Sequence, residues 1–245
     1  MSSLLLDLLF PLRCASCGSG AWPFCPDCVG RLGVVTPPLC DRCGRPVEEA
    51  TLRCRDCPPP SIESARSPLL YAGPVRAALH RLKFGGWQVV AEAFGAAMAT
   101  VNAFEAEVVT WVPLSPARRA RRGFDQARAL AMAVGSRLAL PARQLLERTA
   151  DTPPQARRSG GERRRAMRGA FRPAGRGPPA KVLLVDDVLT TGATAAECAA
   201  VLVSAGAAHV GVLTAARAVS GPVPARCYSR DDSRLSLWLP GDRPR

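Results

Sequence analysis

The chain has 245 residues, and its 33 Lys and Arg residues outnumber its 20 Asp and Glu residues, giving a formal net charge of +13. This length is sufficient for one α/β domain with a small appendage, and no stretch approaches the roughly 18 apolar residues of a membrane-spanning helix. The apolar run Leu4–Phe10 lacks the basic flank and the cleavage site of a secretory signal. We therefore expect a short amphipathic helix there, in a cytoplasmic protein without a membrane partner.

Eight of the ten cysteines lie before residue 58 and form four C-x-x-C pairs. Cytosolic thiols stay reduced, so such pairs indicate metal sites rather than disulfides. Eight thiolates suffice for two tetrahedral Zn²⁺ sites of four thiolates each, which are closed and therefore structural. Sequential pairing gives one site from Cys14, Cys17, Cys25 and Cys28 and another from Cys40, Cys43, Cys54 and Cys57.

Interleaved pairing, a single zinc with four spare thiols, and an iron–sulfur cluster remain alternatives. Residues 1–60 carry six basic and six acidic residues, and zinc-bound thiolates add negative charge. This zinc module therefore has no excess of positive charge, which favours a protein-interaction or scaffold role over DNA recognition.

Three regions differ in composition. Residues 1–60 are rich in Cys and Pro, and the run Pro58–Pro60 ends them as a stiff linker. Residues 61–218 alternate apolar runs with helical patterns, which predicts the α/β class, a parallel sheet flanked by helices. Residues 219–245 are polar and Pro-rich, and we expect a loosely ordered C-terminal tail.

The predicted elements of the middle region follow from hydrophobic periodicity. In chain order they are a strand Leu69–Ala72, helices Gly73–Phe84 and Trp87–Ala103, a buried strand Val108–Val112, a basic loop Pro113–Arg122, a helix Gly123–Ala139, an irregular insert Thr149–Gly169, a strand Val182–Val185, a helix Ala193–Ala205 and a strand Val210–Thr214. An insert of that length in a compact domain is usually a functional loop. Cys198, within a predicted helix, is expected to be a small core residue.

Arginine is concentrated between Arg118 and Arg172, a stretch that contains fifteen Arg and only four acidic residues. Such a stretch favours polyanions, namely phosphate, pyrophosphate or nucleic acid. The alternative is a solvated basic loop without a partner. Few aromatic residues are interleaved for base stacking.

The strand Val182–Val185 leads into the most informative motif of the chain. A continuous apolar run predicts a strand buried on both faces, and open α/β sheets bind ligands at the carboxyl ends of such strands. The next residues, Asp186 and Asp187, can accept hydrogen bonds from the 2′- and 3′-hydroxyls of a ribose. Gly192 permits close backbone approach, and successive N–H groups at a helix N-terminus hold a phosphate. The candidate phosphate-binding residues are Thr190, Thr191, Gly192, Ala193 and Thr194.

This segment resembles the phosphoribosyl-pyrophosphate (PRPP) motif of type I phosphoribosyltransferases, an apolar strand, two acids and T-T-G-x-T. The resemblance implies a type I phosphoribosyltransferase fold that binds PRPP with Mg²⁺. One alternative is an acid-capped strand before a helix. A Walker B strand is the other, but no G-x-x-x-x-G-K-[ST] motif accompanies it.

Two arginine-rich segments complete the expected site. The loop after the strand Val108–Val112 suits the pyrophosphate leaving group, with Arg118 and Arg122 as candidate ligands. The insert resembles a flexible catalytic hood that excludes water and neutralises departing pyrophosphate. Its candidate catalytic residues are Arg163, Arg164, Arg165 and Arg168. Binding of a nucleic-acid backbone by these arginines is the competing hypothesis.

Four segments together resemble the competence-associated ComF/GntX family, over about residues 3 to 217. They are H-R-L-K-F-G-G at 80–86, R-R-G-F-D-Q at 121–126, D-T-P-P-Q at 151–155 and E-R-R-R-A-M-R-G-A-F at 162–171. Asp125 departs from the family's usual Asn, which bears on any amide role there. The resemblance implies a link to DNA uptake, Lys83 among the ligand-binding residues, and a competence helicase or other protein docked on the zinc module.

Three classes of function follow. The first is an enzyme that transfers or removes a 5-phosphoribosyl group, using PRPP or another ribose 5-phosphate ligand and Mg²⁺. The second is a non-catalytic PRPP sensor or a single-stranded DNA-binding adaptor. The third is an adaptor whose zinc module docks onto a helicase or another competence protein. No pattern in the sequence specifies the acceptor.

Overall fold

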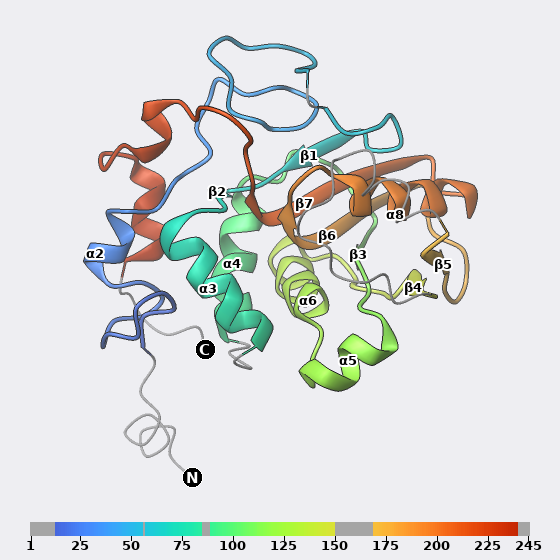
Figure 1. Cartoon of the computed structure of the whole chain (residues 1–245). Helices are drawn as coiled ribbons and strands as arrows, with labels where there is room; N and C mark the ends of the chain where they lie inside the picture. The colour runs from blue at the N-terminus through green and yellow to red at the C-terminus, as the bar shows by residue number, and fades with distance from the viewer. Residues whose placement is uncertain (1–12, 56, 85–88, 150–168, 240–245) are drawn as a thin grey trace.

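The computed structural model describes residues 13–55, 57–84, 89–149 and 169–239. A five-stranded sheet forms its centre, with the order β1-β7-β6-β3 and with β2 also paired to β7, and every pairing is parallel (Figure 1). The strands are β1 (Ser64–Arg66), β2 (Leu69–Leu70), β3 (Val108–Trp111), β6 (Lys181–Leu189) and β7 (His209–Arg217). The predicted class, a parallel sheet flanked by helices, is confirmed.

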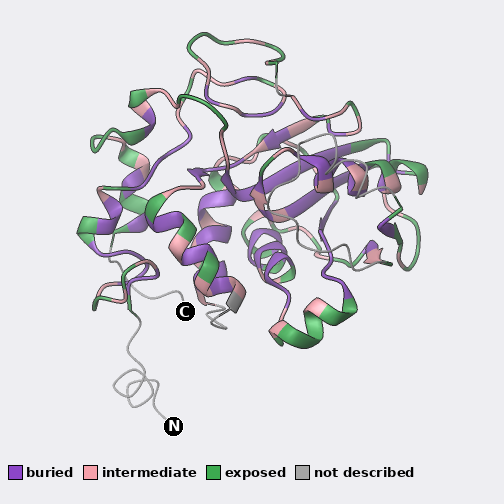
Figure 2. Ribbon diagram, in the orientation of Figure 1, coloured by how far each residue is buried: buried purple, intermediate pink, exposed green. Residues whose placement is uncertain are grey.

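Helices cover both faces of this sheet (Figure 1). The helices α3 (Gly73–Phe84), α4 (Val89–Thr100) and α6 (Gln126–Leu138) share one apolar cluster with Leu183 and Val185 of β6. The helix α8 (Ala193–Ser204) shares the other cluster with Val182 and Leu184. Successive strand residues point to opposite faces, so β6 is buried on both sides, as its apolar run predicted. Figure 2 shows the buried residues concentrated in the sheet and on the inner faces of the helices.

The strand β6 extends beyond the predicted end at Val185 and reaches Leu189, where it still pairs with Arg217 of β7. Asp186 and Asp187 therefore lie on the strand rather than after it. Two further short strands, β4 (Leu146–Arg148) and β5 (Phe171–Pro173), form an antiparallel pair. Strands of three residues are too short for a period to identify them.

The predicted basic loop Pro113–Arg122 is wrong over its second half, which forms the helix α5 (Pro116–Arg122). Ser115 caps its first turn by accepting a hydrogen bond from the Arg118 N–H at 3.4 Å, and Pro116 suits the first helical position. Gly123 ends it in the left-handed region at φ 73°. The prediction failed because α5 buries no residue and so has no apolar face to reveal it.

The zinc module contributes to the main core. Phe24 packs edge-on against Phe94 of α4, with ring centroids 6.4 Å apart, and cysteines of the first C-x-x-C pairs belong to the same apolar cluster as α3 and α4. The only regular helix described there is α2 (Pro26–Val29). Within the described residues, the module therefore folds onto the sheet domain instead of standing apart from it.

The expectation of a loosely ordered tail is wrong for residues 219–239. They include two 3₁₀ helices, η1 (Ala225–Tyr228) and η2 (Ser233–Trp238). Trp238 is 2% exposed and packs on Phe24 and Phe94. Arg226 donates to the carbonyl oxygens of Pro37 and Pro38 in the zinc module. Isolated apolar residues in a polar segment carry no period, so the sequence pattern did not reveal this packing.

Candidate functional site

The two carboxylates at the carboxyl end of β6 lie next to each other, close enough for the Asp187 carboxylate to raise the pKa of Asp186. The Asp187 carboxylate forms an ion pair with the Lys83 ammonium of α3. Burial, and then the Asp186 carboxylate, raise the pKa of the Cys198 thiol well above its ordinary value, which places Asp186 beside α8. The Asp187 N–H donates to Asp186 Oδ1 at 2.8 Å. The structure thus brings Lys83, Asp186 and Asp187 together from two elements about 100 residues apart.

The charged groups at this edge of the sheet are buried close together, and a ligand that donates hydrogen bonds can stabilise them. Burial, and then the Asp187 carboxylate, raise the pKa of Asp186 well above its ordinary value. Burial alone would lower the pKa of Lys83, but the carboxylates of Asp187 and Asp186 outweigh it and raise that pKa. Asp186 is therefore a carboxyl group that needs hydrogen-bond donors, such as hydroxyl groups, to favour its ionised form.

The turn after β6 contains a glycine in a backbone conformation that residues with side chains rarely adopt. Gly192 lies in the left-handed region at φ 71° and ψ 5°, immediately before α8, where a residue with a side chain would be strained. The N-cap residue Gly192 has no side chain to cap the helix, while the Ala193 N–H donates to Thr191 Oγ1 at 3.4 Å. The backbone N–H groups and the positive dipole end at the start of this twelve-residue helix favour an anion there.

The helix α5 presents arginines on two faces. Arg122 donates to Gln126 Oε1 at 3.0 Å. Burial, with the charges of Arg118 and Arg121, lowers the Arg122 pKa, and the Asp187 carboxylate acts in the opposite direction. Arg122 is thus within electrostatic reach of the Asp187 carboxylate. Arg118 lies four residues before it, on the same helix face.

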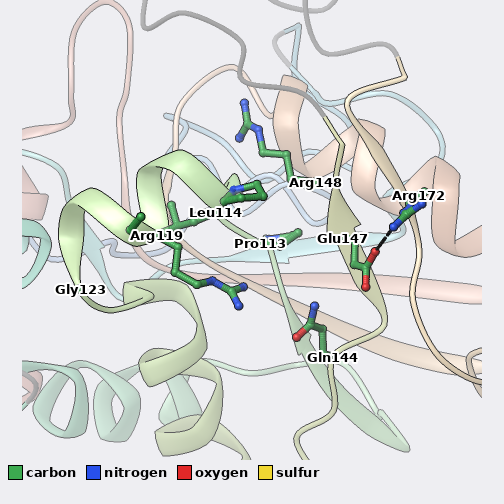
Figure 3. A pocket seen from close by; sticks show the side chains of 10 residues that line it. Pro113, Leu114, Arg119, Gly123, Gln144, Glu147, Arg148 and Arg172 are labelled. Carbon is green, nitrogen blue, oxygen red and sulfur yellow. Dashed lines mark hydrogen bonds and ion pairs between the residues drawn. The ribbon is translucent and has the colours of Figure 1, made fainter.

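The opposite face of α5 borders an open cleft of about 660 Å³ (Figure 3). Arg172 and Glu147 form an ion pair at 2.7 Å on its far wall. Arg148 also lines it, and its guanidinium lies 5.2 Å from the Phe171 ring centroid. The lining residues are Pro113, Leu114, Pro116, Arg119, Ala120, Gly123, Gln144, Glu147, Arg148 and Arg172. Sequence reasoning missed the part contributed by β4 and β5 because those strands were not recognised.

Asp125, the departure from the family's usual Asn, has a structural role. Its carboxylate accepts hydrogen bonds from the Arg128 N–H at 3.2 Å and the Leu114 N–H at 3.4 Å. It therefore caps α6 and fixes the chain entering α5, and both contacts require only an oxygen acceptor. Burial raises the pKa of this carboxyl group.

The eight paired cysteines form two clusters, each with its four sulfur atoms within 4.8 Å of one another. In the second cluster, Cys40 and Cys57 Sγ are 3.5 Å apart, as are Cys43 and Cys54 Sγ. Tetrahedral Zn²⁺ with Zn–S bonds of about 2.3 Å requires sulfur separations of about 3.8 Å. The clusters therefore fit structural zinc with the sequential pairing, and interleaved pairing is wrong.

The four candidate catalytic residues Arg163, Arg164, Arg165 and Arg168 lie outside the described residues. Cys198 is fully buried, as expected for a core residue. No helix among the described residues is long and apolar enough to cross a membrane.

Comparison with known proteins supports the zinc module and finds relatives over most of the chain. Residues 5–58 match the double zinc ribbon domain. The chain is 32% identical over 204 residues to DNA utilization protein YhgH of Escherichia coli O157:H7, covering 79% of this chain and 89% of that protein. It is 28% identical over 191 residues to competence protein ComFC of Streptococcus pneumoniae, covering 76% of this chain and 84% of that protein.

A solved structure described as the allosteric regulatory enzyme of purine biosynthesis overlaps 56% of this chain, with 23% identity and a TM-score of 0.39. The overlap spans only 27% of that enzyme, and a similarity of this size carries no conclusion about activity. The long alignments to YhgH and ComFC, together with the double zinc ribbon, carry the assignment. The chain belongs to the ComF/GntX family.

Proposed function

We propose that this protein binds PRPP at the carboxyl end of β6 and transfers or removes its 5-phosphoribosyl group. One observation carries the proposal. The acids Asp186 and Asp187 adjoin the left-handed turn at Gly192, and Lys83 and Arg122 lie within electrostatic reach of Asp187. Carboxylates that can accept hydrogen bonds from ribose hydroxyls, a turn suited to a phosphate, and cationic groups thus lie near one another, and PRPP needs all three.

Each group has a distinct role in this proposal. The Asp186 and Asp187 carboxylates accept hydrogen bonds from the ribose hydroxyls, and the turn Thr190–Thr194 holds the 5′-phosphate through backbone N–H groups and hydroxyls. Lys83 holds the Asp187 carboxylate in place. Arg118 and Arg122 attract the pyrophosphate group, because guanidinium groups bind phosphate oxygens through paired hydrogen bonds.

The reaction that fits these groups is substitution at the C1′ carbon of the ribose. The bond between C1′ and the pyrophosphate oxygen breaks, its electron pair leaves with pyrophosphate, and a lone pair of the acceptor forms the new bond to C1′. Neutralising the leaving pyrophosphate lowers the barrier. Arg163, Arg164, Arg165 and Arg168 are the proposed source of the further positive charge and of the lid that excludes water.

Mg²⁺ suits the chemistry of this edge, because it prefers carboxylate and phosphate oxygens. Mg²⁺ usually keeps several waters and is bound by one or two carboxylates together with substrate phosphates, and Asp186 and Asp187 supply two carboxylates at this edge. We therefore expect the ion to arrive with PRPP and to supply charge neutralisation at the pyrophosphate. Asp186 and Asp187 would hold it through the ribose hydroxyls or directly.

The relatives named for DNA utilization and competence suggest a role in handling DNA. Arg119 and Arg121 on α5 are exposed, which favours a polyanionic partner such as single-stranded DNA. An adaptor role for the zinc module, docked on a helicase or another protein, is part of the same proposal. A steep salt dependence of DNA affinity that flattens in an Arg119→Ala/Arg121→Ala variant would support direct DNA contact.

Calorimetric titration with PRPP and Mg²⁺ tests the binding proposal. We expect saturable binding by the wild type that depends on Mg²⁺, and at least a tenfold loss of affinity in the Asp186→Asn/Asp187→Asn variant. Ribose 5-phosphate should bind more weakly, since it lacks the pyrophosphate. Absence of PRPP binding by the wild type at millimolar concentration would refute both the enzyme and the sensor hypotheses.

Turnover is tested by pyrophosphate release. PRPP is incubated with Mg²⁺ and protein, alone and with nucleobases, amines or single-stranded DNA as acceptors. Release that the double variant abolishes supports an enzyme. Tight PRPP binding without release under every condition supports the sensor instead.

A further inference from the structure

The segment that follows the last zinc ligand runs directly over the phosphate-binding turn. Pro58 is buried, and a Cβ built on Gly192 would lie only 3.1 Å from the Cβ of Pro58. Three residues later, Ser61 Oγ donates to the Ala196 carbonyl oxygen at 3.2 Å, in the first turn of α8. The chain between Cys57 and Ser61 therefore packs against one side of the turn at Gly192 and hydrogen bonds to the helix that follows it.

A second connection runs through Arg217. This residue ends β7, is 5% exposed, and pairs with Leu189, the last residue of β6 before the turn. Its guanidinium donates to the Cys43 carbonyl oxygen at 2.6 Å and to Cys43 Sγ at 3.4 Å. The Ala218 N–H also donates to the Leu189 carbonyl oxygen at 2.9 Å. A ligand of the second zinc site is thus joined to the strand end from which the turn begins.

We infer that the second cysteine cluster, Cys40, Cys43, Cys54 and Cys57, positions the phosphate-binding turn. Pro58 and Arg217 act as positioning residues on its two sides. A zinc-filled cluster fixes the backbone at both Cys43 and Cys57, and these contacts pass that restraint to Thr190–Thr194. Because equilibrium coupling is reciprocal, a phosphate ligand on the turn should in turn raise the affinity of this cluster for zinc.

This inference depends on the proposed function only for the identity of the ligand, PRPP, so the first test uses protein without any ligand. Amide hydrogen exchange is compared between Pro58→Gly and Pro60→Gly. Both variants loosen the same three-proline run, but Pro60 is exposed and Pro58 is buried against the turn. We expect faster exchange at residues 190–194 in Pro58→Gly than in Pro60→Gly, with two zinc ions per chain retained in both. Equal exchange in the two variants would overturn the inference, whatever the protein binds.

The second test measures the equilibrium transfer of zinc to a chromogenic chelator with and without PRPP and Mg²⁺. The wild type should hold the zinc of the second cluster roughly fivefold or more tightly when the ligand is present, and Arg217→Lys and Pro58→Gly should reduce this protection. A Cys14→Ser variant, which weakens the first cluster, assigns the protected ion. Wild-type binding of PRPP without any protection would contradict the inference, whereas absence of PRPP binding would refute the proposed function and leave the exchange result to decide.

Discussion

The Asp186 carboxyl group shows how a binding site can lower the stability of the folded chain. Its pKa is raised by burial and by Asp187, so the folded chain binds the proton more tightly than the unfolded chain. This carboxyl group therefore reduces the stability of the fold increasingly as the pH rises from the ordinary aspartate pKa to the raised one. PRPP hydroxyl groups should prefer the ionised form, so affinity should rise with pH over the same interval.

Replacing Asp186 with Asn should therefore raise the melting temperature at neutral pH, while the gain shrinks toward acidic pH. Asp187→Asn is the matched control, because it removes the partner of the Lys83 ammonium and should lower the melting temperature. Thermal unfolding followed by circular dichroism from acidic to neutral pH measures both. A lower melting temperature for Asp186→Asn at neutral pH would contradict this account of the site.

At the scale of single residues, the sequence predicted those residues whose partners lie nearby in the chain. The pair Asp186 and Asp187 and the turn at Gly192 lie in one continuous motif, and the four C-x-x-C pairs specify their own clusters. Lys83 was found only through a family resemblance, because its contact with Asp187 depends on how α3 packs. Glu147 and Arg172 could not be predicted, because their pairing depends on two strands of three residues each.

Among the elements, the C-terminal segment best shows what a sequence pattern conceals. Trp238 is nearly fully buried against Phe24 and Phe94, whereas its neighbour Leu237 is 51% exposed. Through the side chain of Trp238, the segment η2 therefore packs against both the zinc module and α4. Buried aromatic residues supply much of the packing energy in a core.

Trp238→Ala should destabilise the protein by about 3–5 kcal/mol, and Leu237→Ala by less than about 0.5 kcal/mol. Urea unfolding at constant zinc content measures the difference. If the two substitutions cost the same, the tail does not pack as described.

The helices and long strands were predictable because burial imposes a period on them. The helix α3 matches its predicted bounds, Gly73–Phe84, since its apolar residues recur at helical spacing. The helix α5 buries no residue and was missed for that reason. The strand β6 was underestimated because its carboxyl end carries the acids of the site instead of apolar residues.

The whole molecule is organised around a core that the zinc module and the sheet domain share. Cys14, Cys28 and Phe24 lie in the same apolar cluster as Leu79 and Phe94. A sequence divided at residue 60 by composition does not reveal this, because composition reports local chemistry and not packing. Zinc should therefore stabilise the sheet domain as well as the ribbon.

Removal of zinc should lower the stability of the entire described structure. We expect elemental analysis to find two zinc ions per chain, and chelation to lower the melting temperature and expose apolar surface on α3 and α4. Binding of a hydrophobic dye and near-ultraviolet circular dichroism measure these changes. A metal-free protein with unchanged melting would show that the clusters lie outside the cooperative fold.

The central claim is that PRPP binds at the carboxyl end of β6. Hydrogen exchange with and without PRPP and Mg²⁺ tests it most directly, since it reports both binding and location. The account predicts slower exchange at residues 186–194, the largest change among the described residues, and no such change in Asp186→Asn/Asp187→Asn. Unchanged exchange at residues 186–194 under conditions where PRPP is bound would contradict it.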